Sequence, residues 1–588
     1  MKQFFITIAG VMVGFFLISI IPLIILVAVI TSTASSVSQK PNQSHSASKV
    51  LRLDLRQAMT DQPQNSIFQD TASLLGIVDK LAKAEGDDNV KGLFIRANSW
   101  GMGPVKAEQI RLAIKDFRDS GKFVIVHSQG FDDTSITSYL SVSAADEIWL
   151  QDTAAFAATG LSTETAFFGG VFEKINAKPE FEQFYEYKNS ANTFTKKTFT
   201  AAHRESTLSW ITDVFNSAIK QIAVDRNMSA TQLRAITDQA PFTSKQAIEA
   251  GLVDKLGHVV EAREAALAKA GGGEIVQMSD YSPPFTAMKD ATIVAFISGE
   301  GAISTGEGAG NPFSSDSGIY SDQMSEAIIA ATKNDKVKAI LIRIDSPGGS
   351  AIASDQIWNA IERAKAKDKK IIISMGQLAA SGGYYIAAGA DAIIAYPTTI
   401  TGSIGVLGGK IVLDETYDMI GYNVEQLKVG GEFAGAYSSS KSFSDEQRAS
   451  FRAGMANIYE DFTGKVAAGR NMPLEEVLEI SKGRVWTGVQ AKENGLVDEL
   501  GGFKTAIAKT KELLELDESD NIKLRRFPAE KSPMEQLFAM FGISTEAAKT
   551  MAKLQFLIDT EQVQALLKVQ QMTEQRPADM QAEIPVVK

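Results

Sequence analysis

The chain has 588 residues, with 59 Lys and Arg, 70 Asp and Glu, and a formal net charge of −11. At about 100–200 residues per domain, this length predicts two to four domains. The acidic balance argues against a dedicated nucleic-acid binder, which usually presents a basic face. The sequence has no cysteine and only four histidines, namely His45, His127, His203 and His258. These counts exclude a disulfide framework, a thiolate metal site, an iron–sulfur cluster and a cysteine nucleophile.

Residues 4–30 form an uncharged, largely apolar run near the start of the chain. A bilayer core needs about 20 such residues, whereas the apolar region of a cleavable signal peptide has about 7–15. We therefore expect a transmembrane anchor over residues 1–31; the alternative is a long signal peptide cut near Ala34. Lys2 precedes the run, so the positive-inside tendency places the N-terminus in the cytoplasm and the body outside the cytoplasmic membrane, which is the periplasm if the source is a Gram-negative bacterium. Residues 32–48 are rich in Ser, Thr, Asn and Gln and are interpreted as a flexible linker.

The rest of the chain contains a long internal repeat. VKGLFIR at 90–96 resembles VKAILIR at 337–343, RNM at 226–228 recurs at 470–472, and AGLVDKLG at 250–257 matches NGLVDELG at 494–501. The offsets are nearly constant, which indicates a tandem duplication of a whole domain rather than a solenoid. We place the two domains at 49–285 and 286–515, followed by a tail at 516–588. An amphipathic stretch in the tail, 534–567, could be a packing helix, an oligomer contact or a membrane-surface element.

The second domain alternates apolar runs with helical patterns. In chain order we expect a strand at 293–297, a helix at 321–333, a strand at 338–344, a helix at 355–366, a strand at 370–374, a helix at 379–388 and a strand at 391–395. This alternation predicts an α/β fold with a largely parallel sheet covered by helices. Sites in such folds form where strands end and helices begin.

Two glycine-rich turns stand out in that domain. DSPGGS at 345–350 follows an expected strand, and it could supply oxyanion-stabilising amides or be an ordinary tight turn. AASGGYY at 379–385 lies between a strand and a helix. Its Ser381 could be a nucleophile or an ordinary helix N-cap.

The repeat helps to choose between these interpretations. When Asp146 is aligned with Asp391 and Tyr139 with Tyr384, Ser381 falls opposite Ile136. Segment 345–350 then falls opposite 98–103, which lacks the Pro-Gly-Gly. Only the second domain carries both parts, and this selective loss favours chemistry over a purely structural turn.

A nucleophilic serine needs a base, and the second domain contains no histidine. His203 lies in a polar helical stretch, His127 ends an apolar strand, His258 follows a repeated loop and His45 is in the linker. None is an attractive partner for a Ser-His-Asp triad. The remaining class is a Ser–Lys dyad, in which burial must lower the lysine pKa from about 10.4 so that the amine is neutral.

SGGYY at 381–385 and TGSIGV at 401–406 resemble the long, tandem form of the signal peptide peptidase A family. These are membrane-bound bacterial serine–lysine endopeptidases whose crotonase-like α/β domain is shared with the proteolytic subunit of Clp protease. The resemblance implies that Ser381 is the nucleophile and that Ser403 orients the lysine. It also implies that the N–H groups of Gly348 and Ser381 stabilise the oxyanion.

In the family the lysine comes from the first repeat, and the position that matches is Lys188. The family pattern has Ser-Ala directly after the lysine and then Pro-Phe; here Asn189 intervenes, and Thr193 stands where the proline is expected. Lys196 and Lys197 are rivals for the role, and a surface location is the alternative for Lys188. On the repeat alignment Lys188 faces Gly431, so the lysine occurs only in the repeat that lacks the serine.

The resemblance further implies a homotetramer tethered to the membrane, with no cofactor, metal or nucleic acid. Its substrates would be signal peptides left after leader cleavage, and other small or unfolded polypeptides. Two other functions remain open from the residues alone. One is a crotonase-type acyl-CoA enzyme, which needs neither Ser381 nor Lys188, and the other is a catalytically silent membrane scaffold.

Overall fold

The computed structural model describes residues 48–62, 72–97, 102–131, 135–284, 290–308 and 318–528. The expected anchor at 1–31, nearly all of the linker at 32–48 and the amphipathic stretch at 534–567 lie outside the described residues. Among the residues that are described, no helix is long and apolar enough to cross a membrane.

The first domain is built on a six-stranded parallel sheet with the order β8-β4-β3-β2-β1-β9. Its strands are β1 (Lys49–Asp54), β2 (Val90–Arg96), β3 (Phe123–Ser128), β4 (Glu147–Leu150), β8 (Lys255–Leu256) and β9 (Glu274–Gln277). Successive side chains of a strand point to opposite faces. Accordingly, Leu93 and Ile95 belong to one core cluster and Phe94 to another. Burial on both faces explains why these strands are continuous apolar runs.

Helices cover both faces of this sheet. One face carries α2 (Leu74–Glu85), α3 (Pro104–Asp119), α4 (Ile136–Leu140), α7 (Ala201–Asp225) and α8 (Ala230–Thr237), and the other carries α10 (Val259–Lys269). The short β5 (Ala155–Phe156), β7 (Phe242–Thr243) and α9 (Ser244–Glu249) complete the domain. The alternation predicted from the sequence is therefore present as helix–sheet–helix layers.

The second domain repeats this plan with an eight-stranded sheet. Its strands are β10 (Thr292–Glu300), β13 (Val337–Ser346), β14 (Lys370–Ala380), β15 (Ala392–Ala395), β16 (Ile400–Gly402), β18 (Val485–Thr487), β19 (Glu499–Leu500) and β20 (Ile522–Arg526). All pairings are parallel except that of β18 with β16. Strand β20 lies beside β10 just as β9 lies beside β1. The second domain thus continues to Arg526, beyond the boundary of 515 placed from the sequence.

The helices of the second domain follow the same scheme. They are α11 (Ser321–Thr332), α12 (Ala351–Lys365), α13 (Gly382–Ala387), α15 (Asp445–Arg470), α16 (Leu474–Ile480), α17 (Gly488–Glu493) and α18 (Phe503–Leu513). A short parallel pair, β11 (Ala302–Ser304) and β12 (Gly318–Tyr320), lies outside the main sheet. Equivalent residues of the two domains make equivalent hydrogen bonds. The hydroxyls of Tyr139 and Tyr384 each donate to the leucine carbonyl of the repeated Gly-Leu-Val-Asp segment. Asp146 and Asp391 each accept from the second backbone amide of β3 and β14.

One expected element is wrong. The sequence predicts a strand at 370–374 and a helix at 379–388, but β14 continues to Ala380 and α13 begins only at Gly382. Alanine favours helices, yet Ala379 pairs with Ser346 of β13 and with Thr401 of β16. These tertiary pairings override the local preference, and they carry the strand to the residue before Ser381.

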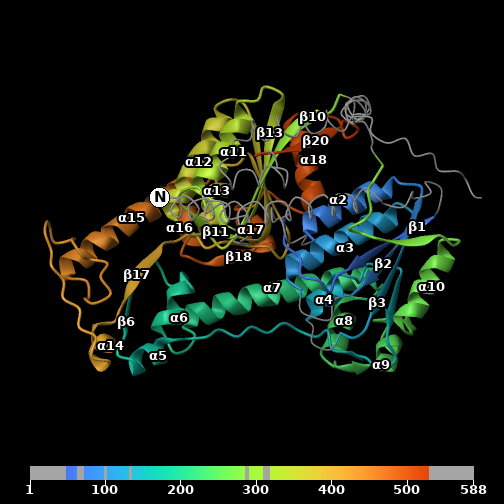
Figure 1. Cartoon of the computed structure of the whole chain (residues 1–588), viewed down its shortest axis with the longest axis horizontal. Helices are drawn as coiled ribbons and strands as arrows, with labels where there is room; N and C mark the ends of the chain where they lie inside the picture. Colours follow the sequence, from blue (N-terminus) through green and yellow to red (C-terminus); the bar gives the residue numbers. More distant parts are fainter. Residues whose placement is uncertain are drawn as a thin grey trace, which may run out of the picture.

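The two domains are joined by several contacts (Figure 1). Strand β6 (Lys178–Gln183) of the first domain pairs antiparallel with β17 (Leu407–Val412) of the second, next to α5 (Gly169–Lys174), α6 (Asn192–Thr195) and α14 (Asp414–Met419). Helix α7 runs beneath the second domain, where it contacts β18. In the core of the junction, Arg343 of β13 pairs with Asp61 at 2.7 Å, and their side chains are 0% and 2% exposed.

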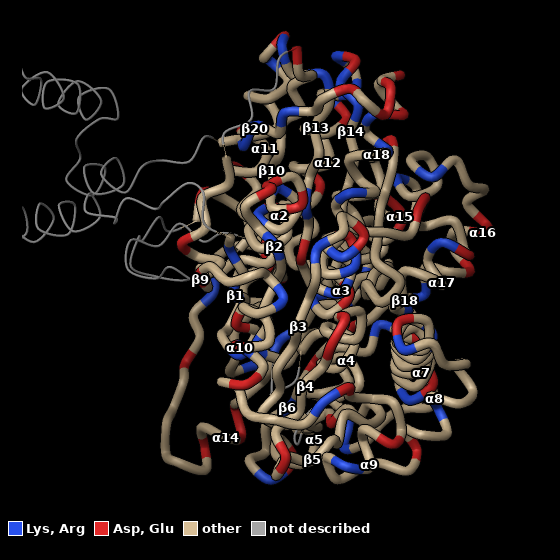
Figure 2. The backbone as a smooth tube through the Cα atoms, turned by 90° about the vertical axis from the view of Figure 1, so that its right-hand side faces the viewer, with Lys and Arg blue, Asp and Glu red and all other residues tan. Residues whose placement is uncertain are grey.

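Charged residues of both signs are interspersed over the face shown in Figure 2. Surface ion pairs of the first domain include Lys115 with Asp119 and Arg118 with Asp146. Exposed pairs of this kind contribute about 0–1 kcal/mol each. The apolar layers and the buried junction, not the surface pairs, therefore hold the fold together.

Candidate active site

Ser381 occupies a strained turn between β14 and α13. Its backbone has φ 54° and ψ −118°, a conformation that a residue with a side chain rarely adopts. The pairing of β14 with β13 and β16 on one side and the start of α13 on the other hold it there. The Ser381 side chain forms no capping hydrogen bond with α13. The N-cap alternative is therefore wrong, and the hydroxyl is directed to another partner.

That partner is Lys188, from the other domain. Lys188 follows the inter-domain strand β6, and its Nζ lies 3.0 Å from Ser381 Oγ. The residue is only 4% exposed. Burial lowers the pKa of Lys188 from 10.5 to about 7, because an ammonium is poorly solvated in such a site. A substantial fraction of this amine is therefore neutral near neutral pH.

Ser403 completes the cluster. Lys188 Nζ lies 2.8 Å from the Ser403 carbonyl oxygen and 3.0 Å from its hydroxyl oxygen. A neutral amine has two N–H groups and one lone pair. If both N–H groups donate to Ser403, the lone pair is left to accept the hydroxyl proton of Ser381. The structure thus brings together the three side chains predicted from the sequence, in an arrangement suited to proton transfer from serine to lysine.

The rival bases lie elsewhere. Lys196 and Lys197 are exposed, and Lys197 pairs with Glu173. His127 is buried in β3, where its Nε2 lies 3.2 Å from the carbonyl oxygen of Gly257 and burial lowers its pKa to about 4.

The other histidines are no better placed. His203 lies on α7 against the rings of Phe167 and Phe199. His258 is the N-cap residue of α10, and His45 lies outside the described residues. In the described part of the chain, no histidine is hydrogen-bonded to Ser381, and no group of three His, Cys, Asp or Glu residues could hold a metal ion.

The glycine turn lies where the resemblance placed it. A Cβ on Gly348 would stand 2.8 Å from Cβ of Ser381 and from the amide nitrogen of Gly382, and its φ is +103°, so only glycine fits. The Gly348 N–H donates to Ser346 Oγ at 3.1 Å, and an oxyanion would have to replace that bond.

The Ser381 N–H, the expected second oxyanion donor, already has a backbone acceptor in the structure. The Ser381 N–H donates to the carbonyl of Gly402 at 2.8 Å, which continues the pairing of β14 with β16. Gly382 is the first residue of α13, so its N–H has no acceptor within the helix. Nothing in the local sequence indicates that β14 reaches Ala380 and thereby occupies the Ser381 amide. The rule that the residue after a nucleophile supplies the amide could have found Gly382.

Comparison with protein families relates these features to known proteins. Peptidase family S49 matches residues 116–271 and 363–517, one segment in each repeat and together more than half of the chain. The Clp protease family matches residues 315–400, which include the Gly348 turn.

Individual relatives extend over most of the chain. The protein is 29% identical over 531 residues to "Serine protease SPPA, chloroplastic" of Arabidopsis thaliana, covering 88% of this chain and 77% of that protein. It is 30% identical over 505 residues to "Protease 4" of Salmonella typhi, covering 83% and 78%. A relative from Enterococcus faecium, 34% identical over 189 residues, is named as a signal peptide peptidase, and the match covers 32% of this chain and 55% of that one. The chain therefore belongs to peptidase family S49, as a tandem-repeat form similar to Protease 4.

Proposed function

We propose that the protein is a membrane-anchored serine endopeptidase that uses Ser381 and Lys188 as a catalytic dyad. The observation that carries the proposal is the 3.0 Å contact between Lys188 Nζ and Ser381 Oγ in a buried site. An ordinary lysine would be charged and solvated. One that is buried, with its pKa lowered to about 7, is a competent general base near neutral pH.

The first half of the reaction forms an acyl-enzyme. The lone pair of Lys188 takes the Ser381 hydroxyl proton while Ser381 Oγ attacks the scissile carbonyl carbon, whose π electrons move to oxygen. The tetrahedral intermediate then collapses and breaks the C–N bond. Lys188, now an ammonium held by both oxygens of Ser403, returns the proton to the leaving amine.

The second half releases the product. A water molecule gives a proton to neutral Lys188 and attacks the ester carbonyl. Collapse of this intermediate breaks the bond to Ser381 Oγ, which recovers the proton from Lys188. Each oxyanion would be stabilised by the Gly382 N–H, with the Gly348 N–H as second donor once Ser346 is displaced. One such donor contributes about 3–4 kcal/mol in measured enzymes.

The substrates we propose are signal peptides left in the membrane after leader cleavage, and other small or unfolded polypeptides. The name of the Enterococcus faecium relative supports this choice. The apolar run at 4–30 supports a single-pass anchor in the cytoplasmic membrane with the body on the extracytoplasmic side. We also propose that the protein forms a homotetramer, because its sequence resembles a family for which this assembly is expected.

The test is cleavage of a fluorogenic leader peptide by the wild type and by Ser381→Ala and Lys188→Ala. Both variants should lose at least about 10³-fold in kcat/KM, because the residues of a catalytic unit fail together. A fluorophosphonate probe should label the wild type but not Ser381→Ala.

The control is Lys197→Ala, which removes a neighbouring exposed lysine and should leave activity unchanged. Full activity in Lys188→Ala would refute the dyad. Probe labelling that survives Ser381→Ala would move the nucleophile elsewhere, and a folded wild type that cleaves no peptide would favour the scaffold.

A further inference from the structure

Residues 482–484, which we call the positioning segment, contact both sides of the dyad through their backbone. The carbonyl of Lys482 accepts from the N–H of Tyr187, the residue before Lys188, at 3.3 Å. The carbonyl of Arg484 accepts from the N–H of Ser403 at 2.7 Å. Three consecutive residues are thus hydrogen-bonded both to the chain that carries the lysine and to the serine that orients it.

Gly483, in the middle of the segment, lies directly against the main chain of Lys188. A Cβ on Gly483 would stand 2.5 Å from the Lys188 nitrogen and 2.7 Å from its Cα, and these backbone atoms cannot rotate away. Its φ is +81°, and its N–H donates to the carbonyl of Ile404 at 2.9 Å. Only glycine permits this approach, so the position of Lys188 depends on the absence of a side chain here.

The side chain of Arg484 fixes the segment from the other side. Its guanidinium lies between the rings of Tyr187 and Trp486, 5.0 and 4.7 Å from their centroids. It also forms a two-pronged ion pair with Glu205 of α7, in which Nη2 donates to Oε1 at 2.8 Å. This planar, bidentate arrangement is one that arginine makes and lysine does not.

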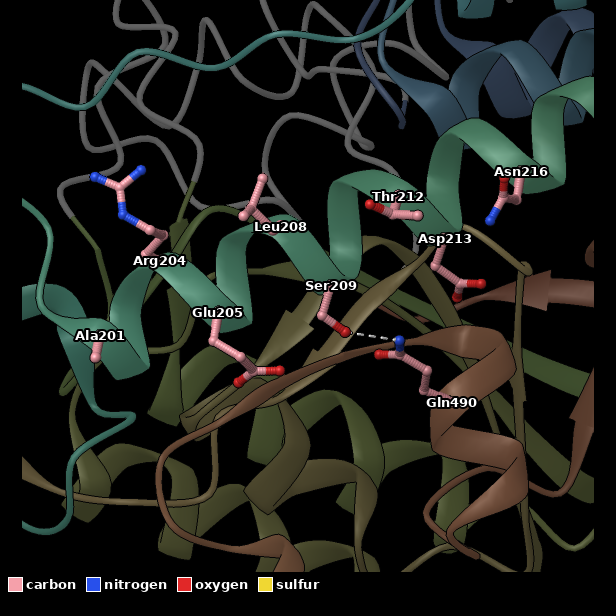
Figure 3. A pocket seen from close by; sticks show the side chains of 9 residues that line it. All are labelled: Ala201, Arg204, Glu205, Leu208, Ser209, Thr212, Asp213, Asn216 and Gln490. Carbon is pink, nitrogen blue, oxygen red and sulfur yellow. Dashed lines mark hydrogen bonds between the residues drawn. The ribbon is translucent and has the colours of Figure 1, made fainter. Parts of the chain in front are cut away.

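Glu205 belongs to a row of α7 side chains that contact the second domain (Figure 3). One turn further along α7, Ser209 accepts from Nε2 of Gln490 at 3.1 Å. Glu205, Ser209 and Gln490 also line a surface pocket along α7. Neither dyad residue lines that pocket. Helix α7 therefore anchors the positioning segment from the first domain.

The first repeat provides an internal comparison. Thr243 and Thr487 begin the equivalent helices α9 and α17, each with the same capping box, so they set the alignment. On that register Gln239 and Ala240 stand where Gly483 and Arg484 stand. The copy in the first repeat leads into β7, which pairs with β5. The glycine and the arginine thus occur only in the copy that contacts the dyad.

We propose that residues 482–484 are a positioning element that sets the reach of Lys188 to Ser381, with Gly483 and Arg484 as its essential residues. The inference rests on the proposed function, because it assigns these residues to a dyad. The inference adds that the position of Lys188 relative to the second repeat is set by this segment as well as by the pairing of β6 with β17.

The main test is Gly483→Ala against Gly495→Ala. Both glycines have φ +81°, so both variants carry the same backbone strain, but a Cβ on Gly495 would meet only the flexible end of Met472. We expect kcat for the leader peptide to fall by about 10²-fold or more in Gly483→Ala, because a displacement of about 1 Å is enough for such a loss. KM should change little, since the segment is not argued to touch substrate. Gly495→Ala should keep its kcat.

Two milder variants test the same inference if Gly483→Ala does not fold. Arg484→Lys keeps the charge but loses the bidentate pair and the stacking, so kcat and the rate of fluorophosphonate labelling should both fall. Its control is Arg226→Lys, which disrupts another two-pronged arginine–carboxylate pair, with Asp254 in the first repeat, and should leave both unchanged. Thermal unfolding of all four variants shows which of them retain the fold.

The outcomes separate this inference from the proposed function. If Ser381→Ala and Lys188→Ala are inactive but the folded Gly483→Ala and Arg484→Lys match their controls, the positioning role is wrong and the dyad stands. If these variants instead have a raised KM and an unchanged kcat, the positioning role is also wrong. If Gly483→Ala does not fold, a normal kcat in Arg484→Lys decides against the proposal. Activity in Lys188→Ala would refute the dyad itself.

Discussion

The two repeats share a scaffold and differ at the end of one strand. In the first domain β3 stops at Ser128, after six residues, whereas its counterpart β14 runs for eleven residues to Ala380. The additional residues pair with β16 and deliver the chain into the strained turn at Ser381. An extended strand with two partners can hold a strained turn that a loop would relax. The longer strand therefore explains how the second copy holds Ser381 in its strained conformation.

The first domain differs in a complementary way. Its strand β6 leaves the domain to pair with β17 of the second, and Lys188 follows directly. Neither copy has both the serine and the lysine, so a single site is built from the two. If Ser381 and Lys188 form the proposed dyad, the duplication has a physical reason, because the second copy supplies the serine and also buries the lysine.

The prediction with the largest expected effect tests whether the lysine and the serine of one site come from the two repeats of the same chain. In the structure Lys188 and Ser381 of one chain contact each other, so a mixture of Ser381→Ala and Lys188→Ala proteins contains no complete site. We expect the co-expressed variants to remain at least about 10³-fold below the wild type in leader-peptide cleavage. Recovery of a sizeable share of activity would show that the lysine and serine come from different chains.

The second prediction concerns pH. Only neutral Lys188 can accept the serine proton, and its pKa is about 7. Log kcat/KM should therefore rise with a slope of about one per pH unit below pH 7 and level off above it. The measurement is a pH–rate profile from pH 5 to 9 on the leader peptide. A profile that is flat through pH 7 would contradict a lysine base with this pKa.

The same pKa has a consequence for stability. Between about pH 7 and 10.5 the unfolded chain binds a proton on Lys188 that the folded chain does not, so this group makes stability rise with pH in that window. Lys188→Met removes the dependence. The variant should be more stable than the wild type near pH 7, and its advantage should shrink as the pH approaches 10.5 in urea unfolding at several pH values. A constant difference would mean that Lys188 is solvated.

The sequence predicts much of this molecule because the signals are local or duplicated. Apolar runs mark the strands, and the repeated Gly-Leu-Val-Asp and Asp146/Asp391 positions carry the same hydrogen bonds in both domains. Ser381, Lys188 and Ser403 could be named because each belongs to a short motif of a known family. The structure adds that they are in contact.

What the sequence does not reveal depends on pairing between distant segments. Residues 377–380 have no local strand signal, and they become a strand only because β13 and β16 flank them. The amide of Ser381 is occupied for the same reason. The role of Gly483 is likewise invisible without its contact with Lys188. The repeat alignment, which sets Gly483 against Gln239, is the one sequence signal that could have drawn attention to it.

The fourth prediction compares a buried ion pair between the domains with one inside a domain. Asp61→Ala leaves Arg343 without its carboxylate at a fully buried position, which costs about 3–5 kcal/mol of unfolding free energy. Asp225→Ala removes the partner of Arg111 within the first domain, where the two side chains are 8% and 5% exposed and water can reach the unpaired charge more easily. The loss should therefore be smaller for Asp225→Ala in urea unfolding. A larger loss for Asp225→Ala would mean that the junction contributes less than the first domain's own contacts.

The smallest predicted effect separates two equivalent helix caps. Thr243→Ala and Thr487→Ala each remove a capping box, which costs about 1 kcal/mol. Thr487 also donates to Asp213 of α7 in the other domain, whereas Thr243 is exposed and makes no such bond among the described residues. Thr487→Ala should thus cost about 1–2 kcal/mol more, because a carboxylate at the junction loses its partner. Matched urea unfolding curves measure the difference. Equal losses would mean that the contact between α7 and the second domain adds no stability there, and that β6, β17 and the Asp61–Arg343 pair are sufficient to hold Lys188 against Ser381.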